Sequence, residues 1–100
     1  MKSQKDFVLD KFRRNIDSID RRIVSLISKR FEIVRRIGTH KATHGLLPCD
    51  KEREKEILAR LAQQCALQQI DAALVTSIFK LIFRSSKHEH ARIAQRRKHV

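Results

Sequence analysis

Two cationic residues, Arg30 and Lys41, occupy positions of this 100-residue sequence where a helix would place apolar side chains. Apolar residues recur at steps of three and four before and after Arg30, so its guanidinium falls on the apolar face. Lys41 lies within about 20° of the same face and ~16 Å further along the helix axis. A cation on such a face costs several kcal/mol unless an anion meets it. The pair therefore indicates a binding site for an anion.

Polar residues also interrupt the apolar faces of two later segments. Arg53 and Glu54 each precede an apolar residue by four positions, and Ser86 and His90 stand one turn apart in a third apolar stripe. An arginine in the first turn of a helix opposes the helix dipole, so stability does not favour Arg53 there. The inward cations outnumber the inward acids. This predicts a pocket for a small dianion, most naturally a dicarboxylate held by arginines.

Each of these residues also has a structural interpretation. Arg30 could pair with a buried acid such as Glu54, and Lys41 could extend to solvent near the end of its helix. Ser86 could donate to the preceding turn, and His90 could be a satisfied core histidine. Only the combination of residues favours a binding pocket over these separate roles.

Motifs for nucleophilic, metal-dependent or phosphate-binding catalysis are missing from the sequence. It contains no Ser/His/Asp elbow, no Gly-rich phosphate loop and no HExxH segment. Cys49 and Cys65 lack the spacing of a zinc site or a disulfide framework, so we expect reduced thiols, no metal and no cofactor. A cationic pocket without a nucleophile fits a reaction driven by orientation and electrostatic stabilisation.

The first predicted helix, from about residue 6 to about residue 43, is unusually long. About 35 residues span ~50 Å, whereas a compact chain of this length has a radius of gyration of only ~13 Å. The helix would project beyond its own domain, so its apolar seam needs cover, which a second copy of the chain supplies most economically. We expect an intertwined homodimer; the alternative is a helix broken near Gly38 that folds back. The seam consists of Phe12, Ile16, Ile19, Ile23, Leu26, Ile33 and Ile37.

Two shorter helices are expected to complete an all-α, three-helix protomer. The scarcity of breakers, 2 Gly and 1 Pro, favours a few long helices. After a break at residues 44–48, Asp50 caps a helix that runs to about Ala66. Asp71 caps a third helix, which runs from about Ala72 to beyond residue 93. We expect one domain over residues 1–100.

The net charge of +12 indicates an anionic partner: nucleic acid, a membrane surface or a small polyanion. Part of the excess lies at the end of the chain, where a basic tail from about residue 94 to residue 100 should be frayed and solvated. No apolar run of about 18 residues could span a membrane. The first residues lack the apolar region of a secretory signal, so we expect a cytoplasmic protein.

Taken together, these residues resemble those of the all-helical (AroQ-type) chorismate mutases. The similarity covers roughly residues 7–93 and rests on combined spacing, with no single diagnostic motif. The resemblance implies a three-helix protomer and an intertwined homodimer with two equivalent sites. It also implies conversion of chorismate to prephenate without a cofactor, at the branch toward phenylalanine and tyrosine. The matching residues are Phe12–Asp20, Leu26–Arg30, Lys41, Gly45–Pro48, Asp50, Arg53 and Glu54.

The resemblance also assigns roles to individual residues. Arg30 and the partner's Arg13 would hold the two substrate carboxylates, and Lys41 would bond the ether oxygen and a carboxylate. Arg13 lies ~25 Å from Arg30 along the same helix, so it cannot serve that site in cis. Asp50 and Arg53 would help to order the substrate and the loop. Glu54 would bind the ring hydroxyl, and Ser86 would support the ring end.

His90 departs from the family pattern, which usually has Gln or Glu donating to the ether oxygen at this position. Histidine can donate through either ring nitrogen, so we expect His90 to keep this role. Activity would then depend on pH near the titration range of imidazole. The alternative alignment, with Ser85 and Glu89, would require a shift of the helix.

Three other functions stay open. An isochorismate pyruvate lyase would have a very similar fold and site. A small basic nucleic-acid-binding protein would explain the charge, but the sequence has no Trp or Tyr and its key cations lie on the apolar face. A regulatory or scaffold relative could have lost activity through His90.

Overall fold

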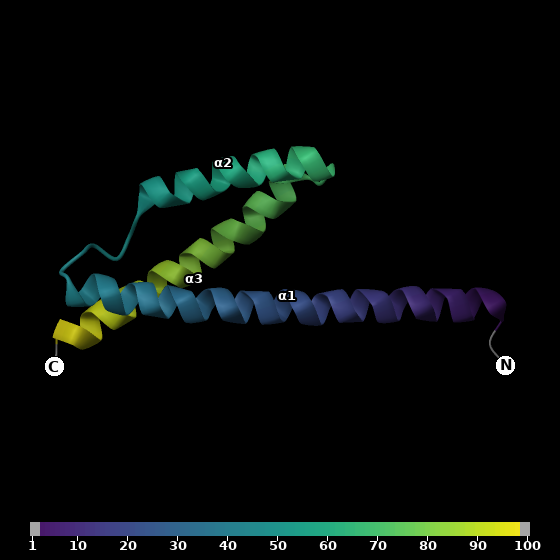
Figure 1. Cartoon of the computed structure of the whole chain (residues 1–100), viewed down its shortest axis with the longest axis horizontal. Coiled ribbons are helices and arrows are strands. Elements are labelled where there is room, and N and C mark those ends of the chain that lie inside the picture. The colour runs from purple at the N-terminus through teal and green to yellow at the C-terminus, as the bar shows by residue number, and fades with distance from the viewer. Residues whose placement is uncertain (1–2, 99–100) are drawn as a thin grey trace. The chain divides into compact units, whose positions relative to one another are not determined.

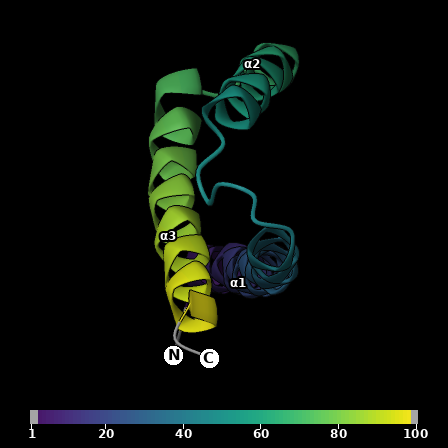
Figure 2. The ribbon, with the colours of Figure 1, turned by 90° about the vertical axis from the view of Figure 1, so that its left-hand side faces the viewer.

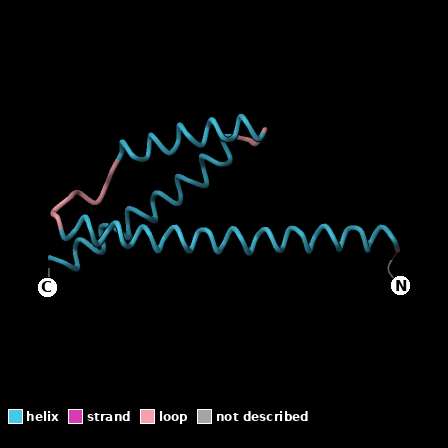
Figure 3. The backbone as a smooth tube through the Cα atoms, in the orientation of Figure 1, coloured by secondary structure: helices cyan, strands magenta, loops and turns pink. Residues whose placement is uncertain are grey.

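The computed structural model describes residues 3–98, which form three helices and no strand (Figure 1). The helices are α1 (Gln4–Thr43), α2 (Lys51–Gln68) and α3 (Ala72–Lys98). Coil is confined to the connections between them and to the chain start (Figure 3). The predicted all-helical fold with a long first helix is therefore confirmed. Within the described residues, no helix is long and apolar enough to cross a membrane.

Helix boundaries coincide with the capping residues in the sequence. The Asp50 carboxylate accepts a hydrogen bond from the main-chain N–H of Arg53 at 3.0 Å, and that of Asp71 accepts from Ala73 at 2.9 Å. These bonds satisfy N–H groups that the first turn of a helix leaves unpaired. α1 ends where Gly45 adopts a left-handed φ of 66°, which glycine reaches without steric strain.

The end of α3 differs from the sequence prediction. Residues 94–98 were expected to be frayed, but α3 continues through them to Lys98. No proline or glycine interrupts this stretch, so nothing in the sequence stops the helix. Residues 99 and 100 of the predicted tail lie outside the described residues.

The chain divides into two compact units, Met1–Glu32 and Ile33–Val100. The first unit comprises the N-terminal part of α1, whose start is capped by reciprocal hydrogen bonds. The Ser3 main-chain N–H donates to the Asp6 carboxylate at 3.1 Å, and the Asp6 N–H donates to the Ser3 hydroxyl at 3.3 Å. This reciprocal pairing is the capping-box arrangement.

The second unit contains the last turns of α1 together with α2 and α3. In Figure 2, α2 is seen nearly end-on beside the first turns of α3. α2 packs against α3, and Cys65 of α2 and Phe83 of α3 are buried. From α1, Val34 and Gly38 are buried. His90 of α3 is also buried, at 9% exposure. The functional residues predicted in this unit are thus placed around a small core.

The apolar seam of α1 is exposed within the single chain. Phe12, Ile23 and Leu26 retain 57%, 49% and 63% of their accessible surface. In the second unit, α1 buries Val34 and Gly38, one position along from the seam residues Ile33 and Ile37. The seam residues are therefore exposed in the structure, and the α1 residues that are buried in the second unit lie beside the seam.

Candidate functional site

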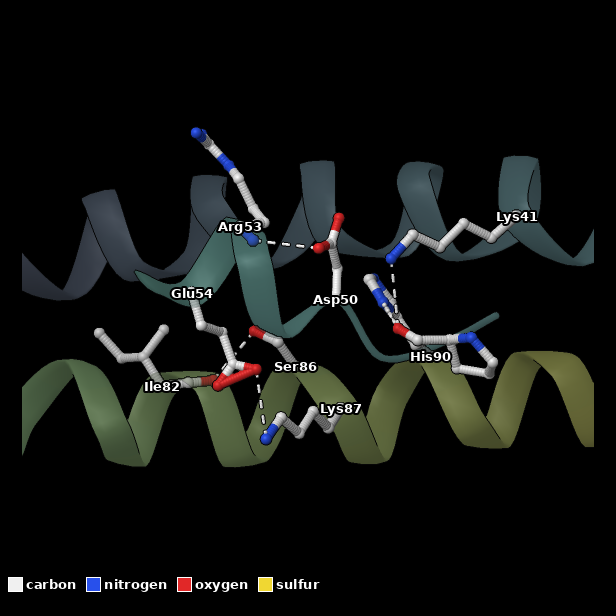
Figure 4. A network of polar contacts seen from close by, with 9 residues as sticks. Lys41, Asp50, Arg53, Glu54, Ile82, Ser86, Lys87 and His90 are labelled. Atoms are coloured by element: carbon white, nitrogen blue, oxygen red, sulfur yellow. Dashed lines mark hydrogen bonds and ion pairs between the residues drawn. The ribbon is translucent and has the colours of Figure 1, made fainter. Parts of the chain in front are cut away.

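Lys41 and His90 converge on one main-chain carbonyl in the second unit (Figure 4). The half-buried Lys41 ammonium donates to the Pro48 carbonyl oxygen at 3.2 Å. The Nδ1 atom of His90 lies 3.1 Å from the same oxygen. The Nε2 atom of His90 lies 2.8 Å from the Val34 carbonyl oxygen. One imidazole from α3 thereby links α1 to the loop that precedes α2.

Gly38 is the reason the imidazole can lie so close to α1. A Cβ atom at residue 38 would be 2.9 Å from His90 Cδ2 and 2.9 Å from Ile93 Cδ1. Such distances are shorter than van der Waals contact, so a larger residue would force α1 and α3 apart. α1 continues unbroken through Gly38, and the alternative of a helix that breaks there is wrong. Glycine serves close packing at this position.

Glu54 and Ser86 meet where α2 faces α3 (Figure 4). The Glu54 carboxylate forms an ion pair with the Lys87 ammonium at 3.2 Å, which places it beside Ser86. The Ser86 hydroxyl donates to the Ile82 carbonyl at 2.9 Å. This is the bond to the preceding turn that the sequence offered as a structural interpretation of Ser86. Lys87 was not predicted as a site residue, because its place in the sequence resembles that of any exposed lysine.

Asp50 and Arg53 lie at the start of α2. Asp50 caps the helix through the Arg53 main-chain N–H. The Arg53 guanidinium pairs with the Glu56 carboxylate at 3.2 Å and points away from Lys41 and His90 (Figure 4). This pair is exposed, so water and salt screen it and it is weak. The Arg53 side chain is therefore easily redirected.

Arg13 and Arg30 belong to the first unit. Both lie on α1, Arg13 exposed and Arg30 half-buried. The other predicted site residues belong to the second unit, where Lys41 and His90 share the Pro48 carbonyl. The residues of this second group are Lys41, Asp50, Arg53, Glu54, Ser86 and His90.

The inward register of α3 is that of Ser86 and His90. Ser85 is exposed, and the Glu89 carboxylate pairs with the Arg92 guanidinium on its own helix. The hydrogen bond from Arg92 lowers the pKa of Glu89, and the charges of Arg92, Arg35 and Arg96 lower it further. Glu89 therefore stays ionised and engaged with arginines.

Potential metal ligands do not cluster in the structure. Residues 3–98 contain no group of three or more His, Cys, Asp or Glu side chains placed to hold a metal ion. Cys49 is exposed and Cys65 is buried, and both are free thiols. What the described residues offer is a half-buried ammonium, a buried imidazole, a carboxylate and a hydroxyl. This set suits recognition of a polar, anionic small molecule.

Comparison with known proteins identifies the family. The model of the family "Chorismate mutase type II" matches residues 12–91. A chorismate mutase of Methanocaldococcus jannaschii is 30% identical over 79 residues, which cover 79% of this chain and 80% of that protein. The T-protein of Haemophilus influenzae is 33% identical over 78 residues, which cover 78% of this chain and 21% of that protein.

A bifunctional chorismate mutase/prephenate dehydratase of Buchnera aphidicola is 33% identical over 75 residues, 75% of this chain and 20% of that protein. The chain thus spans about a fifth of the T-protein and of the bifunctional relative. The family match covers all the predicted site residues: Arg13 and Arg30 of the first unit, and Lys41, Asp50, Arg53, Glu54, Ser86 and His90 of the second. The chain belongs to the chorismate mutase type II family.

Proposed function

We propose that this chain is an isomerase that converts chorismate to prephenate in aromatic amino-acid biosynthesis, without a cofactor. The observation that carries this proposal is the family match across residues 12–91. It is supported by the Lys41 ammonium, which is half-buried and hydrogen-bonded to a neutral carbonyl. A neutral acceptor does not cancel the charge of the ammonium, so Lys41 can still attract an anion.

The reaction is an intramolecular rearrangement in which a C–O bond breaks and a C–C bond forms. The enzyme accelerates it by binding the compact, diaxial conformer of chorismate. Negative charge grows on the ether oxygen in the transition state, and a preorganised cation stabilises it more than it stabilises the substrate. We assign this role to Lys41, whose ammonium has three N–H donors: one would stay on the Pro48 carbonyl while the others contact the ether oxygen and a carboxylate.

Arginines would hold the two carboxylates of the substrate. We assign one carboxylate to Arg30 and the other to the partner's Arg13, since bidentate guanidinium pairs suit planar carboxylates. Arg13 and Arg30 lie on one continuous helix, 17 residues or ~25 Å apart. That separation exceeds the size of the substrate, so the two residues would serve one site only from different chains.

A homodimer is therefore part of the proposal, with residues 1–100 acting as one domain in each copy. It is supported by the exposed seam of α1, an apolar face too extensive for an isolated soluble chain. A second copy presents the same seam and could cover it along its length.

The remaining residues would recognise the ring end of the substrate. Lys87 occupies one oxygen of the Glu54 carboxylate, and the other can accept the ring hydroxyl. The Ser86 hydroxyl, which donates to the Ile82 carbonyl, would support the ring end of the substrate. Arg53 would leave its weak surface pair with Glu56 to order the substrate, together with Asp50.

The free thiols of Cys49 and Cys65 and the biosynthetic family fit a cytoplasmic location, which we also propose.

The decisive experiment is to incubate the purified chain with chorismate and, separately, with isochorismate. We expect prephenate from chorismate. Pyruvate release from isochorismate without prephenate formation would identify a lyase instead. Turnover of neither substrate, with salt-dependent DNA binding, would favour the nucleic-acid-binding alternative.

A further inference from the structure

We propose that His90 is a positioning residue whose imidazolium spans the Val34 and Pro48 carbonyls and thereby fixes the oxygen that orients the Lys41 ammonium. The consequence for catalysis rests on the proposed function, whereas the geometry does not. The family pattern predicted a different role, direct donation to the substrate. The two roles give different experimental results, set out below.

The number of N–H groups on the His90 ring decides which protonation state can make both of its contacts. Carbonyl oxygens accept hydrogen bonds and cannot donate them, and both ring nitrogens of His90 lie within 3.1 Å of one. A neutral imidazole has a single N–H, so it satisfies one of the two contacts and leaves the other without a proton. Only the doubly protonated ring makes both hydrogen bonds.

The surroundings of His90 indicate a built contact and not a chance approach. The ring is buried, and its two acceptors lie 42 and 56 residues away in the sequence. Gly38 leaves room for the ring edge against α1. Three segments of the chain therefore meet at this side chain: α1, the loop before α2, and α3.

The link to Lys41 is the shared acceptor. The Pro48 oxygen has two lone pairs, and it accepts from the Lys41 ammonium at 3.2 Å as well as from His90. If His90 releases this oxygen, the loop at residues 44–50 loses a tie to α3. The acceptor that orients the ammonium then moves with the loop. A misplacement of about 1 Å in a catalytic group can cost ~100-fold in rate.

Charged groups from every packed element surround the ring. Lys41 from α1 shares the Pro48 oxygen with His90, and Asp50 belongs to the same loop as Pro48. The nearby ion pair of Glu54 from α2 with Lys87 from α3 is neutral overall. On α3, Glu89 is neutralised by Arg92. Loss of one N–H from the ring would break one of the two hydrogen bonds.

The first test is spectroscopic and needs no substrate. The ¹⁵N spectrum of the histidine rings in the purified chain is recorded from about pH 5 to about pH 8. The His90 signals are identified by their loss in His90→Gln, with His88→Gln, an exposed residue of the same helix, as control. We expect both ring nitrogens of His90 to be protonated at about pH 5. A neutral ring there in the folded chain would overturn the proposal.

The second test asks whether His90 acts through Lys41. His90→Gln keeps a hydrogen-bond donor of the family type, but one amide cannot span both carbonyls. We expect it to lower kcat/KM by about 10- to 100-fold, mainly through kcat, and to do so much less in a Lys41→Met background. Equal losses in both backgrounds would overturn the proposal. Unchanged or improved turnover in His90→Gln would indicate direct donation.

A third measurement covers the case in which Lys41→Met has no measurable activity. The ¹⁵N signal of the Lys41 side chain, identified by its loss in Lys41→Met, should exchange its protons faster with water in His90→Gln than in the wild type. Identical exchange would overturn the proposal. If the wild-type chain does not convert chorismate, the proposed function fails, while both spectra still decide the role of His90.

Discussion

Arg30 is a cation on the apolar face of α1, and its proposed role in binding a substrate carboxylate can be tested by truncation. Arg30→Ala removes the guanidinium proposed to bind a substrate carboxylate, so we expect kcat/KM to fall at least about a hundredfold. The dimer should persist, because the seam residues are unchanged. Steady-state kinetics and size-exclusion chromatography measure the two properties. Arg22→Ala, which changes an exposed arginine of the same helix, is the control and should behave like the wild type.

Near-normal turnover in Arg30→Ala would remove this residue from the site.

We expect Gly38→Ala to change the free energy of unfolding in the direction opposite to that of most Gly→Ala substitutions in helices. Alanine normally stabilises a helix by about 1 kcal/mol relative to glycine. At residue 38 the added methyl group would overlap the His90 ring and the end of Ile93, so we expect Gly38→Ala to destabilise the chain by about 1–3 kcal/mol. Urea denaturation measures this free energy of unfolding. Thr39→Ala, at an exposed neighbouring position, should change it by less than about 0.5 kcal/mol.

If Gly38→Ala proved more stable than the wild type, the close approach of α1 and α3 would be contradicted.

At the scale of the single residue, sequence patterns could find side chains but not their main-chain partners. Lys41 and His90 were identified because polar residues interrupted apolar stripes. The Pro48 and Val34 carbonyls that they meet have no counterpart in any sequence pattern, because every residue carries such an acceptor. The Glu54–Lys87 pair joins two helices, so it depends on their packing.

At the scale of the elements, the helices and their caps were predictable from local chemistry. Asp50 and Asp71 mark the starts of α2 and α3, as expected of N-cap residues. The packed face of α1 in the second unit was not predictable. The spacing favoured Ile33 and Ile37, whereas Val34 and Gly38 are buried. His90 of α3 contacts α1 at Val34 and Gly38, one position along from the apolar stripe, and the spacing of apolar residues does not reveal such a contact.

The end of α2 offers a test of helix termination. Gln69 adopts φ 56°, a left-handed conformation that is strained for any residue with a Cβ. Its N–H donates to Ala66 and that of Ile70 to Cys65, so the conformation is fixed by hydrogen bonds. We expect Gln69→Gly to raise the free energy of unfolding by about 1 kcal/mol.

The matched control is Gln68→Gly, one residue earlier and still helical, which should lower that free energy by a similar amount. Equal effects at both positions in thermal or urea unfolding would contradict the left-handed cap.

At the scale of the whole molecule, the exposed seam and the position of Arg13 make the dimer testable through activity. Arg13→Ala and Arg30→Ala chains should each be inactive. When they are mixed, unfolded and refolded together, one of the two sites in each mixed dimer carries both arginines. We therefore expect partial recovery, up to about half of the activity per mixed dimer. Prephenate formation measures it, and each variant refolded by itself is the control.

No recovery would contradict a site shared between chains. Composition and periodicity predicted the fold class, whereas the homodimer expected from the length of the first helix stays a prediction that this experiment tests.

The close approach of Gly38 to the His90 imidazole couples two residues that are 52 positions apart in the sequence. The effect of a substitution at one of them depends on the side chain at the other. A methyl group at 38 becomes acceptable once the ring at 90 is replaced by a flexible chain such as glutamine, since the end of Ile93 can rotate aside. The destabilisation caused by Gly38→Ala should then be smaller in a His90→Gln background than in the wild type. The side chain at residue 90 therefore limits how large residue 38 can be.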